Sequence, residues 1–141
     1  MRALSIYPDW AMLMYEGEKT IEVRRWQTPY RGELLFCTTQ VKIPDCISGH
    51  ALFIATIADV QPFSWKHLDA ACLDEMPSEP CFAWILKDLQ YIHPFPVKGK
   101  QGFFHVDDTL IRRLPDDISD EEAERFVQTE FVPLLYHPSR R

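Results

Sequence analysis

Residues 17–24 read Gly-Glu-Lys-Thr-Ile-Glu-Val-Arg, and they carry the strongest structural signal in the chain. Polar and apolar residues alternate over positions 19–24, which predicts a β-strand. Because successive side chains of a strand point to opposite faces, Ile21 and Val23 are expected on one face. The polar residues expected on the other face are Thr20, Glu22 and Arg24. The segment therefore brings polar groups together on one side of a sheet.

A short strand and a short helix are predicted before this segment. Residues 3–6, Ala-Leu-Ser-Ile, are typical of a strand. The stretch Pro8–Glu16 has apolar residues at helical spacing, with Pro8 suited to the first turn and Gly17 to the position after the last turn. A strand followed by a helix and a tight turn thus leads into residues 19–24.

Further strands are predicted after the segment, each rich in β-branched or aromatic residues and bounded by turn-forming residues. They are Glu33–Thr39, Ala51–Val60, Phe82–Ile92 and Phe103–Val106. A weaker pattern predicts a helix over Trp65–Glu75. The fold class expected is α+β, mainly β: a barrel of five to six strands, closed or nearly closed, with a short N-terminal helix.

The C-terminal part of the chain predicts one more helix. Ser119 can cap its first turn, and Glu122, three residues later, can return the hydrogen bond. Apolar residues continue at near-helical spacing, and Pro133 is expected to kink the helix. We expect its apolar stripe to pack on the barrel as a brace rather than to bind a partner.

Length and composition predict a single domain over residues 1–141, with a body at 3–107 and a C-terminal helical extension at 108–141. The 141 residues are 46% hydrophobic and 26% charged, and no apolar run is long enough to span a bilayer. The N-terminal stretch lacks a signal-peptide pattern, so a cytoplasmic location is expected. The four cysteines and five histidines lack metal-ligand spacing, so free thiols, no metal and no cofactor are expected.

The net charge of −6 argues against a protein that holds duplex nucleic acid mainly by neutralising phosphates. The acidity is local, however. Residues 107–130 contain nine acidic and three basic residues, which accounts for the whole net charge. The rest of the chain is balanced, with twelve acidic and twelve basic residues, so the body is neutral.

Three segments together resemble the ASCH family of PUA-like domains. The first is Leu4-Ser5-Ile6 followed by Trp10-Ala11, and the second runs from Gly17 to Arg24 and on through Trp26 to Tyr30-Arg31-Gly32. The third is Phe82-Ala83-Trp84 leading to residues 96–102, Pro-Val-Lys-Gly-Lys-Gln-Gly. The resemblance spans residues 3–107. It implies a β-barrel with a cleft between the first helix, the strand at 19–24 and the later lysine-glycine loop.

The resemblance also implies a function related to RNA. PUA-like relatives bind RNA or modified bases, and some small ASCH proteins act as acetylcytidine amidohydrolases or as ribonucleases. In those amidohydrolases, a Lys-x-x-Thr-x-Arg segment supplies a lysine and a nucleophilic threonine. Lys19 and Arg24 match this pattern, but Glu22 stands at the threonine position. Thr20 lies two residues away and is not an equivalent replacement, so Glu22 would have to act on a water molecule instead.

The chemistry of these side chains supports a polar cleft independently of the resemblance. Lys19 and Arg24 can donate hydrogen bonds to a phosphate or a base edge, with Glu22 between them. Shielding from water would lower the proton affinity of Lys19 and allow it to serve as a general base. The simpler alternative is an exposed strand edge on which the three charges merely pair with one another.

Further residues are expected to contact a ligand. The glycines of the loop at residues 98–102 either expose backbone N–H groups to a phosphate or simply turn the chain. Aromatic side chains near the motif can stack on a base, whereas Trp84 is assigned to the core. The predicted catalytic residues are Lys19 and Glu22, and the predicted ligand-binding residues are Trp10, Thr20, Arg24, Trp26, Tyr30, Arg31, Lys98, Gly99, Lys100 and Gln101.

Three functions remain open on the sequence. The first is a module that binds RNA or a modified nucleoside without turnover. The second is a small hydrolase that uses Lys19 and Glu22 on an acylated nucleoside or on RNA. The third is an adaptor that meets a basic protein partner through residues 107–130. The sequence leaves the oligomeric state undetermined.

Overall fold

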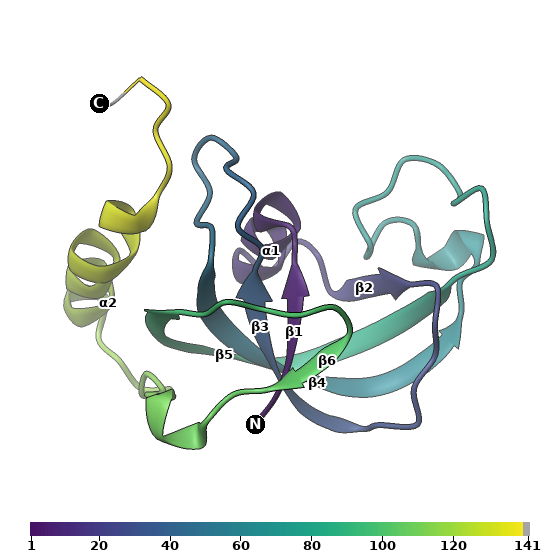
Figure 1. Cartoon of the computed structure of the whole chain (residues 1–141), viewed down its shortest axis with the longest axis horizontal. Coiled ribbons are helices and arrows are strands. Elements are labelled where there is room, and N and C mark those ends of the chain that lie inside the picture. The colour runs from purple at the N-terminus through teal and green to yellow at the C-terminus, as the bar shows by residue number, and fades with distance from the viewer. Residues whose placement is uncertain (140–141) are drawn as a thin grey trace.

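The structure is a computed structural model, and it describes residues 1–139. Its six strands are β1 (Arg2–Ile6), β2 (Ile21–Arg24), β3 (Gly32–Thr38), β4 (His50–Pro62), β5 (Phe82–Pro96) and β6 (Phe103–His105). They form one sheet in the order β2-β5-β4-β3-β1-β6, which curls into a half-barrel (Figure 1). β1 and β3 are parallel, and the other pairs are antiparallel. The predicted mainly β fold with two helices is confirmed.

The two edge strands of the half-barrel meet through aromatic side chains. Trp26 directly follows the β2 edge, and its ring lies 5.0 Å from that of Phe103 on the β6 edge. Both rings also contact Trp84 on β5, which is fully buried as predicted. The two edges are thus joined by ring packing and not by a backbone ladder, so the barrel is not closed by strand pairing.

The helix α1 (Pro8–Tyr15) packs on the sheet through Ala11 and Met14 and follows the sequence prediction closely. Pro8 occupies the first turn, where its missing N–H has no intrahelical partner to lose. Gly17 follows the end of the helix with φ +84°, a conformation that glycine adopts without steric cost. The sharp turn after α1 directs the chain into the β2 segment.

The predicted helix over Trp65–Glu75 is wrong. A short 3₁₀ helix covers only Trp65–His67, and the chain then turns through residues 68–72. The Ser64 side chain and the His67 ring cap the first turn reciprocally. Cys72 adopts φ +58°, which ends any helical path. The strand at 19–24 is also shorter than predicted, since β2 begins only at Ile21.

The C-terminal extension packs on the body as predicted. Ser119 caps α2 (Asp120–Phe126) by accepting a hydrogen bond from the Glu122 N–H. The helix continues as a π-helical turn over Val127–Phe131 and then as a 3₁₀ turn over Val132–Leu134. The α-helical path is therefore broken in the region of Pro133, where a kink was predicted. Phe131 is buried against Tyr15 of α1, with ring centroids 4.8 Å apart. No helix among residues 1–139 has the length and hydrophobicity needed to cross a membrane.

Candidate functional site

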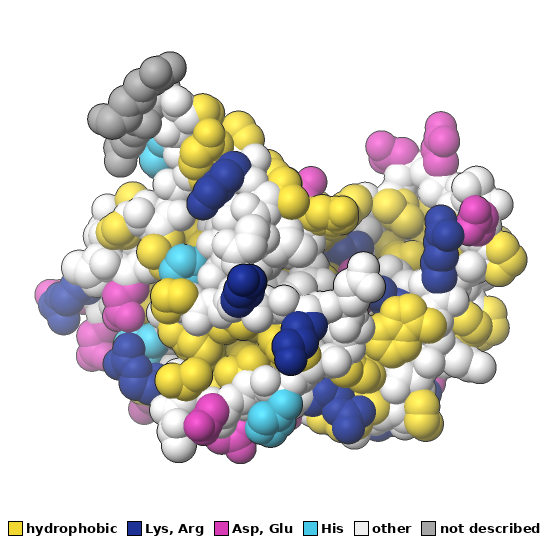
Figure 2. Space-filling view, in the orientation of Figure 1, with side chains coloured by type: hydrophobic (Ala, Val, Ile, Leu, Met, Phe, Trp, Pro, Cys, Tyr) yellow, Lys and Arg dark blue, Asp and Glu magenta, His cyan; other side chains and the backbone are white. Residues whose placement is uncertain are grey.

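A cleft of about 1020 Å³ opens where β1 and β3 end, beside β2 and the start of α1. The loop between β5 and β6 forms its far side. Figure 2 shows Lys and Arg side chains in and around the hollow of this face of the molecule. The residues that line the cleft are Ser5, Ile6, Tyr7, Trp10, Lys19, Glu22, Val23, Arg24, Arg25, Trp26, Thr39, Gln40, Leu73, Lys98, Gly99, Lys100, Gln101 and Gly102.

Lys19 is the most unusual side chain of the cleft, because it is charged and only 4% exposed. Its Nζ donates a 2.7 Å hydrogen bond to the Ala71 carbonyl and lies 4.6 Å from the centre of the Trp10 ring. Burial lowers the pKa of Lys19 from its ordinary value of 10.5, while the nearby Glu22 carboxylate partly opposes the shift. Within residues 1–139 only one of its three N–H groups has a hydrogen-bond partner, so two can meet a ligand.

The turn at residues 68–72 explains how Lys19 is held. The Ala70 carbonyl accepts hydrogen bonds from the N–H groups of Thr20 and Ile21, at 2.9 and 3.2 Å. The next carbonyl, that of Ala71, accepts the Lys19 ammonium group. A helix running to residue 75 would have used both carbonyls internally. Because these residues form a turn and not the predicted helix, their carbonyls can accept hydrogen bonds from the start of β2 and from Lys19.

Glu22 and Arg24 form a fixed pair on β2. Glu22 is 6% exposed, and its Oε2 accepts a 3.0 Å hydrogen bond from the Arg24 Nε. Its Oε1 accepts a longer bond from the Val23 N–H. Arg24 also donates through Nη2 to the Ser5 carbonyl, 2.9 Å away. Both side chains are thus positioned across the gap between β2 and β1, which no backbone ladder spans.

The loop at residues 98–102 approaches β1 so closely that a side chain at Gly99 would collide with the Ser5 hydroxyl unless that hydroxyl moved. A Cβ atom on Gly99 would lie 2.0 Å from the Ser5 Oγ. Gly102 has φ +67° and turns the chain into β6. Gly102 thus turns the chain, which is one of the two roles expected of the loop glycines, and Gly99 lies close against β1. The Lys98 and Lys100 side chains stay exposed at the rim of the cleft.

Two buried hydroxyl groups beside this loop lack partners. Among the described residues, the Ser5 Oγ and the Thr39 Oγ1 are the buried side-chain polar atoms that make no hydrogen bond. Both residues line the cleft. A buried hydroxyl without a partner costs free energy, and such groups are often retained where a ligand or water completes them.

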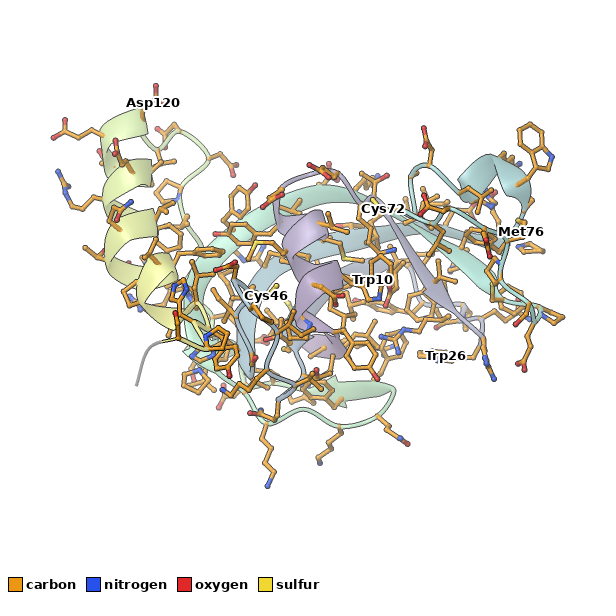
Figure 3. All side chains as sticks on the ribbon, turned by 90° about the horizontal axis from the view of Figure 1, so that it is seen from above. Trp10, Trp26, Cys46, Cys72, Met76 and Asp120 are labelled. Carbon is orange, nitrogen blue, oxygen red and sulfur yellow. The ribbon has the colours of Figure 1, made fainter. Side chains whose placement is uncertain are left out.

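The two tryptophans predicted to stack on a base differ in availability. Trp10 lines the cleft from α1 and is half-buried, with Lys19 against its ring. Trp26 lies apart from Trp10, as Figure 3 shows, and its ring is packed edge-on against Trp84 and Phe103. Trp10 is therefore the better candidate for stacking, and Trp26 serves as a wall.

The cleft brings together most, but not all, of the predicted site residues. It contains both predicted catalytic residues and all the predicted ligand-binding residues except three. Thr20 is exposed outside the cleft, and the Tyr30 hydroxyl is bonded to the Glu33 carbonyl. Arg31 donates to the Thr28 carbonyl and lies 3.6 Å from Asp59.

Sequence reasoning missed five lining residues that matter to the character of the cleft. They are Ser5, Arg25, Thr39, Gln40 and Leu73. Ser5 belongs to the first segment that resembles the family, and Thr39 is the last residue of a predicted strand. Their positions near the ends of strands could have indicated that they line the cleft. Leu73 enters through the irregular turn after Trp65–His67, for which the sequence offered no signal.

The charge of the cleft is opposite to that of the chain. Five lining residues are cationic, namely Lys19, Arg24, Arg25, Lys98 and Lys100, and Glu22 is the one carboxylate among the lining residues. The whole chain carries −6. Clustering of one sign of charge in a concave site attracts ligands of the opposite sign. Within residues 1–139 no group of three or more His, Cys, Asp or Glu side chains is placed to hold a metal ion.

The curled sheet and the polar cleft at its open end define a small β-barrel domain of the PUA-like type. The ASCH domain family model matches residues 4–96, so the chain belongs to the ASCH domain family. The ASCH protein from Zymomonas mobilis has a similar structure, with a TM-score of 0.61 and 18% identity over 91% of this chain and 94% of that chain.

Two mutant forms of that Zymomonas protein are also similar. Their TM-scores are 0.57 and 0.54, each at 16% identity, and they cover 91% and 90% of this chain and 96% and 94% of their own. At these identities the likeness establishes the fold. No curated protein matches the chain.

The contact between Ser5 and Gly99 generates a prediction about stability. We expect Gly99→Ala to lower the free energy of unfolding by about 1–3 kcal/mol, because the added methyl group overpacks the loop against Ser5. Ser5→Ala alone is expected to be nearly neutral, since its hydroxyl has no partner. The double mutant should recover much of the loss, and urea unfolding of all four proteins measures the coupling. Additive effects would show that the two residues are not in contact.

The buried Lys19 generates a prediction about pH. Because the folded-state pKa lies below 10.5, the unfolded chain binds more protons between the two pKa values, and stability from this group rises with pH through that window. Lys19→Met removes the effect. The free energy of unfolding of the wild type minus that of Lys19→Met should therefore increase as the pH approaches 10.5. Urea unfolding at a series of pH values measures it, and a constant difference would mean that the pKa is not lowered.

Proposed function

We propose that the protein recognises RNA or a modified nucleoside in this cleft. One observation carries the proposal: a net-acidic chain gathers five cations around a concave site that also offers an aromatic ring. Phosphate groups favour cationic surroundings, and unpaired bases favour aromatic faces. Membership of a PUA-like family supports the same class of ligand.

The two ends of the cleft suit different parts of a nucleotide. Lys98 and Lys100 stand at the rim, beside the unpartnered hydroxyl groups of Ser5 and Thr39, and they suit a phosphate or sugar. Trp10 and Lys19 lie toward the other end, where a base can stack and accept hydrogen bonds.

The size of the site favours a short ligand. A cleft of about 1020 Å³ has room for a few nucleotides at most, whereas the rest of the surface is too acidic to follow a long strand. A cytoplasmic setting fits this ligand, and all four cysteines are free thiols, as suits a reducing compartment.

Binding of a short single-stranded RNA labelled with fluorescein tests the proposal. Trp10→Ala should weaken binding by about tenfold, since stacking of one base is worth ~1–3 kcal/mol. Trp65→Ala is the matched control, because Trp65 is 78% exposed and does not line the cleft. Lys19→Met should likewise weaken binding, with the exposed Lys87→Met as its control. Equal affinities for the site variants and their controls would refute the proposal.

A hydrolase is the second candidate, and the state of Lys19 favours it. A buried lysine of lowered pKa is more often unprotonated, and so can accept a proton from water more readily, than an ordinary lysine. The hydroxide formed would add to the acyl carbon of an acylated nucleoside, and the nitrogen leaving group would take up the proton from Lys19. Glu22, already held by Arg24, would orient the water.

Product analysis after incubation with acylated nucleosides and short RNAs tests this second function. Lys19→Met and Glu22→Gln are each expected to abolish product formation while the thermal unfolding curve stays cooperative. Lys87→Met provides the control for loss of a lysine outside the cleft. Turnover that persists in both site variants would exclude the mechanism, and binding without any product would leave the protein as a recognition module.

A further inference from the structure

A second cavity, of about 470 Å³, lies between the body and the C-terminal extension. We call it the C-terminal groove. Its lining residues are Tyr15, Leu89, Gln90, Tyr91, Leu114, Pro115, Asp116, Ile118, Ala123, Phe126 and Val127. It shares no residue with the cationic cleft. A function of this groove can therefore be separated experimentally from that of the cleft.

The walls of the C-terminal groove are fixed by specific contacts. The Leu114 N–H donates to the Tyr91 carbonyl at 3.0 Å, which ties the extension to β5. Just before it, Arg113 makes two hydrogen bonds to the Glu33 carboxylate, of 2.7 and 3.0 Å. On the other wall, the buried Phe126 anchors α2. Because both walls are tied to the sheet, the groove is a built feature of the fold.

The groove exposes apolar side chains from both walls. Leu89 and Tyr91 of β5 are 37% and 40% exposed, and Val127 at the end of α2 is 37% exposed. Contiguous apolar surface of this kind on a soluble domain often marks an interaction site. The side chains come from β5 and from the extension, so a ligand seated between them would contact both.

The unpaired charges at and beside the rim of the groove are acidic, because the one arginine among residues 1–139 that contacts a lining residue, Arg113 through Gln90, is paired with Glu33. Asp116 lines it directly, and Asp120 and Glu124 lie one turn apart on α2. Glu124 is three residues before Val127, which places it on the same side of the helix as a lining residue. None of these three carboxylates forms an ion pair with another residue in the part of the chain that the structure describes. Figure 3 places Asp120 at the opposite end of the molecule from Met76, well away from Trp10.

We propose that the C-terminal groove is a docking site for a basic segment of another protein, one that presents an apolar side chain flanked by lysine or arginine. The apolar floor would take the side chain, and the acidic rim would pair with the flanking cations. The same acids repel nucleic acid, and they would also repel the acidic rim of a second copy of this chain. Charge complementarity thus selects a basic protein segment over either of those.

A labelled model peptide of alternating lysine and leucine residues tests the proposal by fluorescence anisotropy. Asp116→Lys combined with Glu124→Lys should weaken binding by about tenfold or more, because two attractions become repulsions. Asp74→Lys combined with Glu75→Lys is the matched control, since these exposed acids lie in the loop between β4 and β5 and change the charge equally. Leu89→Ser should weaken binding through the apolar floor.

Several outcomes would overturn the proposal. Equal loss in the control pair, or equal binding of a lysine-serine peptide, would show that the contact is non-specific attraction. Binding of an uncharged apolar dye with no binding of the peptide would assign the groove to a small molecule. Self-association abolished by Leu89→Ser would assign it to a second copy. Trp10→Ala should leave peptide binding unchanged, so failure here is distinguishable from failure of the RNA proposal.

Discussion

Burial of the Lys19 ammonium group is the constraint to which the neighbouring segments conform. An ammonium group that is removed from water without a partner costs several kcal/mol, so the surroundings must supply acceptors. They do so from two parts of the chain: the turn at residues 68–72 gives the Ala71 carbonyl, and α1 gives the Trp10 ring. The same turn pairs through Ala70 with the start of β2. One buried charge thus fixes the relation of α1, β2 and the loop after β4.

The molecule separates its charges into two regions with different chemistry. Cations surround the cleft at the open end of the barrel, and the acids are concentrated in the extension that packs on β5. Since interactions between exposed charges are screened within about 10 Å at moderate salt, the two regions act on ligands nearly independently. The net charge of −6 is therefore a poor guide to the cleft, because it reports the extension.

The sequence predicted the strands and the first helix well because their signals are local. Alternation placed Ile21 and Val23 correctly on an apolar face, and Pro8 and Gly17 marked the limits of α1. Predictions failed where a distant contact decided the structure. β2 starts only at Ile21, and residues 68–75 do not form the predicted helix, because the carbonyls of Ala70 and Ala71 serve the start of β2 and Lys19. The need for glycine at position 99 likewise depends on Ser5, far away in sequence.

The arrangement around Glu22 favours recognition over hydrolysis. Its two carboxylate oxygens accept hydrogen bonds from Arg24 and from the Val23 N–H. A general base must offer a lone pair to water, and each oxygen of this carboxylate already has a donor within hydrogen-bond distance. Lys19, by contrast, keeps two N–H groups without a partner among the described residues and is suited to donate. A cleft that presents donors more readily than bases is better equipped to hold the acceptors of a base and a phosphate than to activate water.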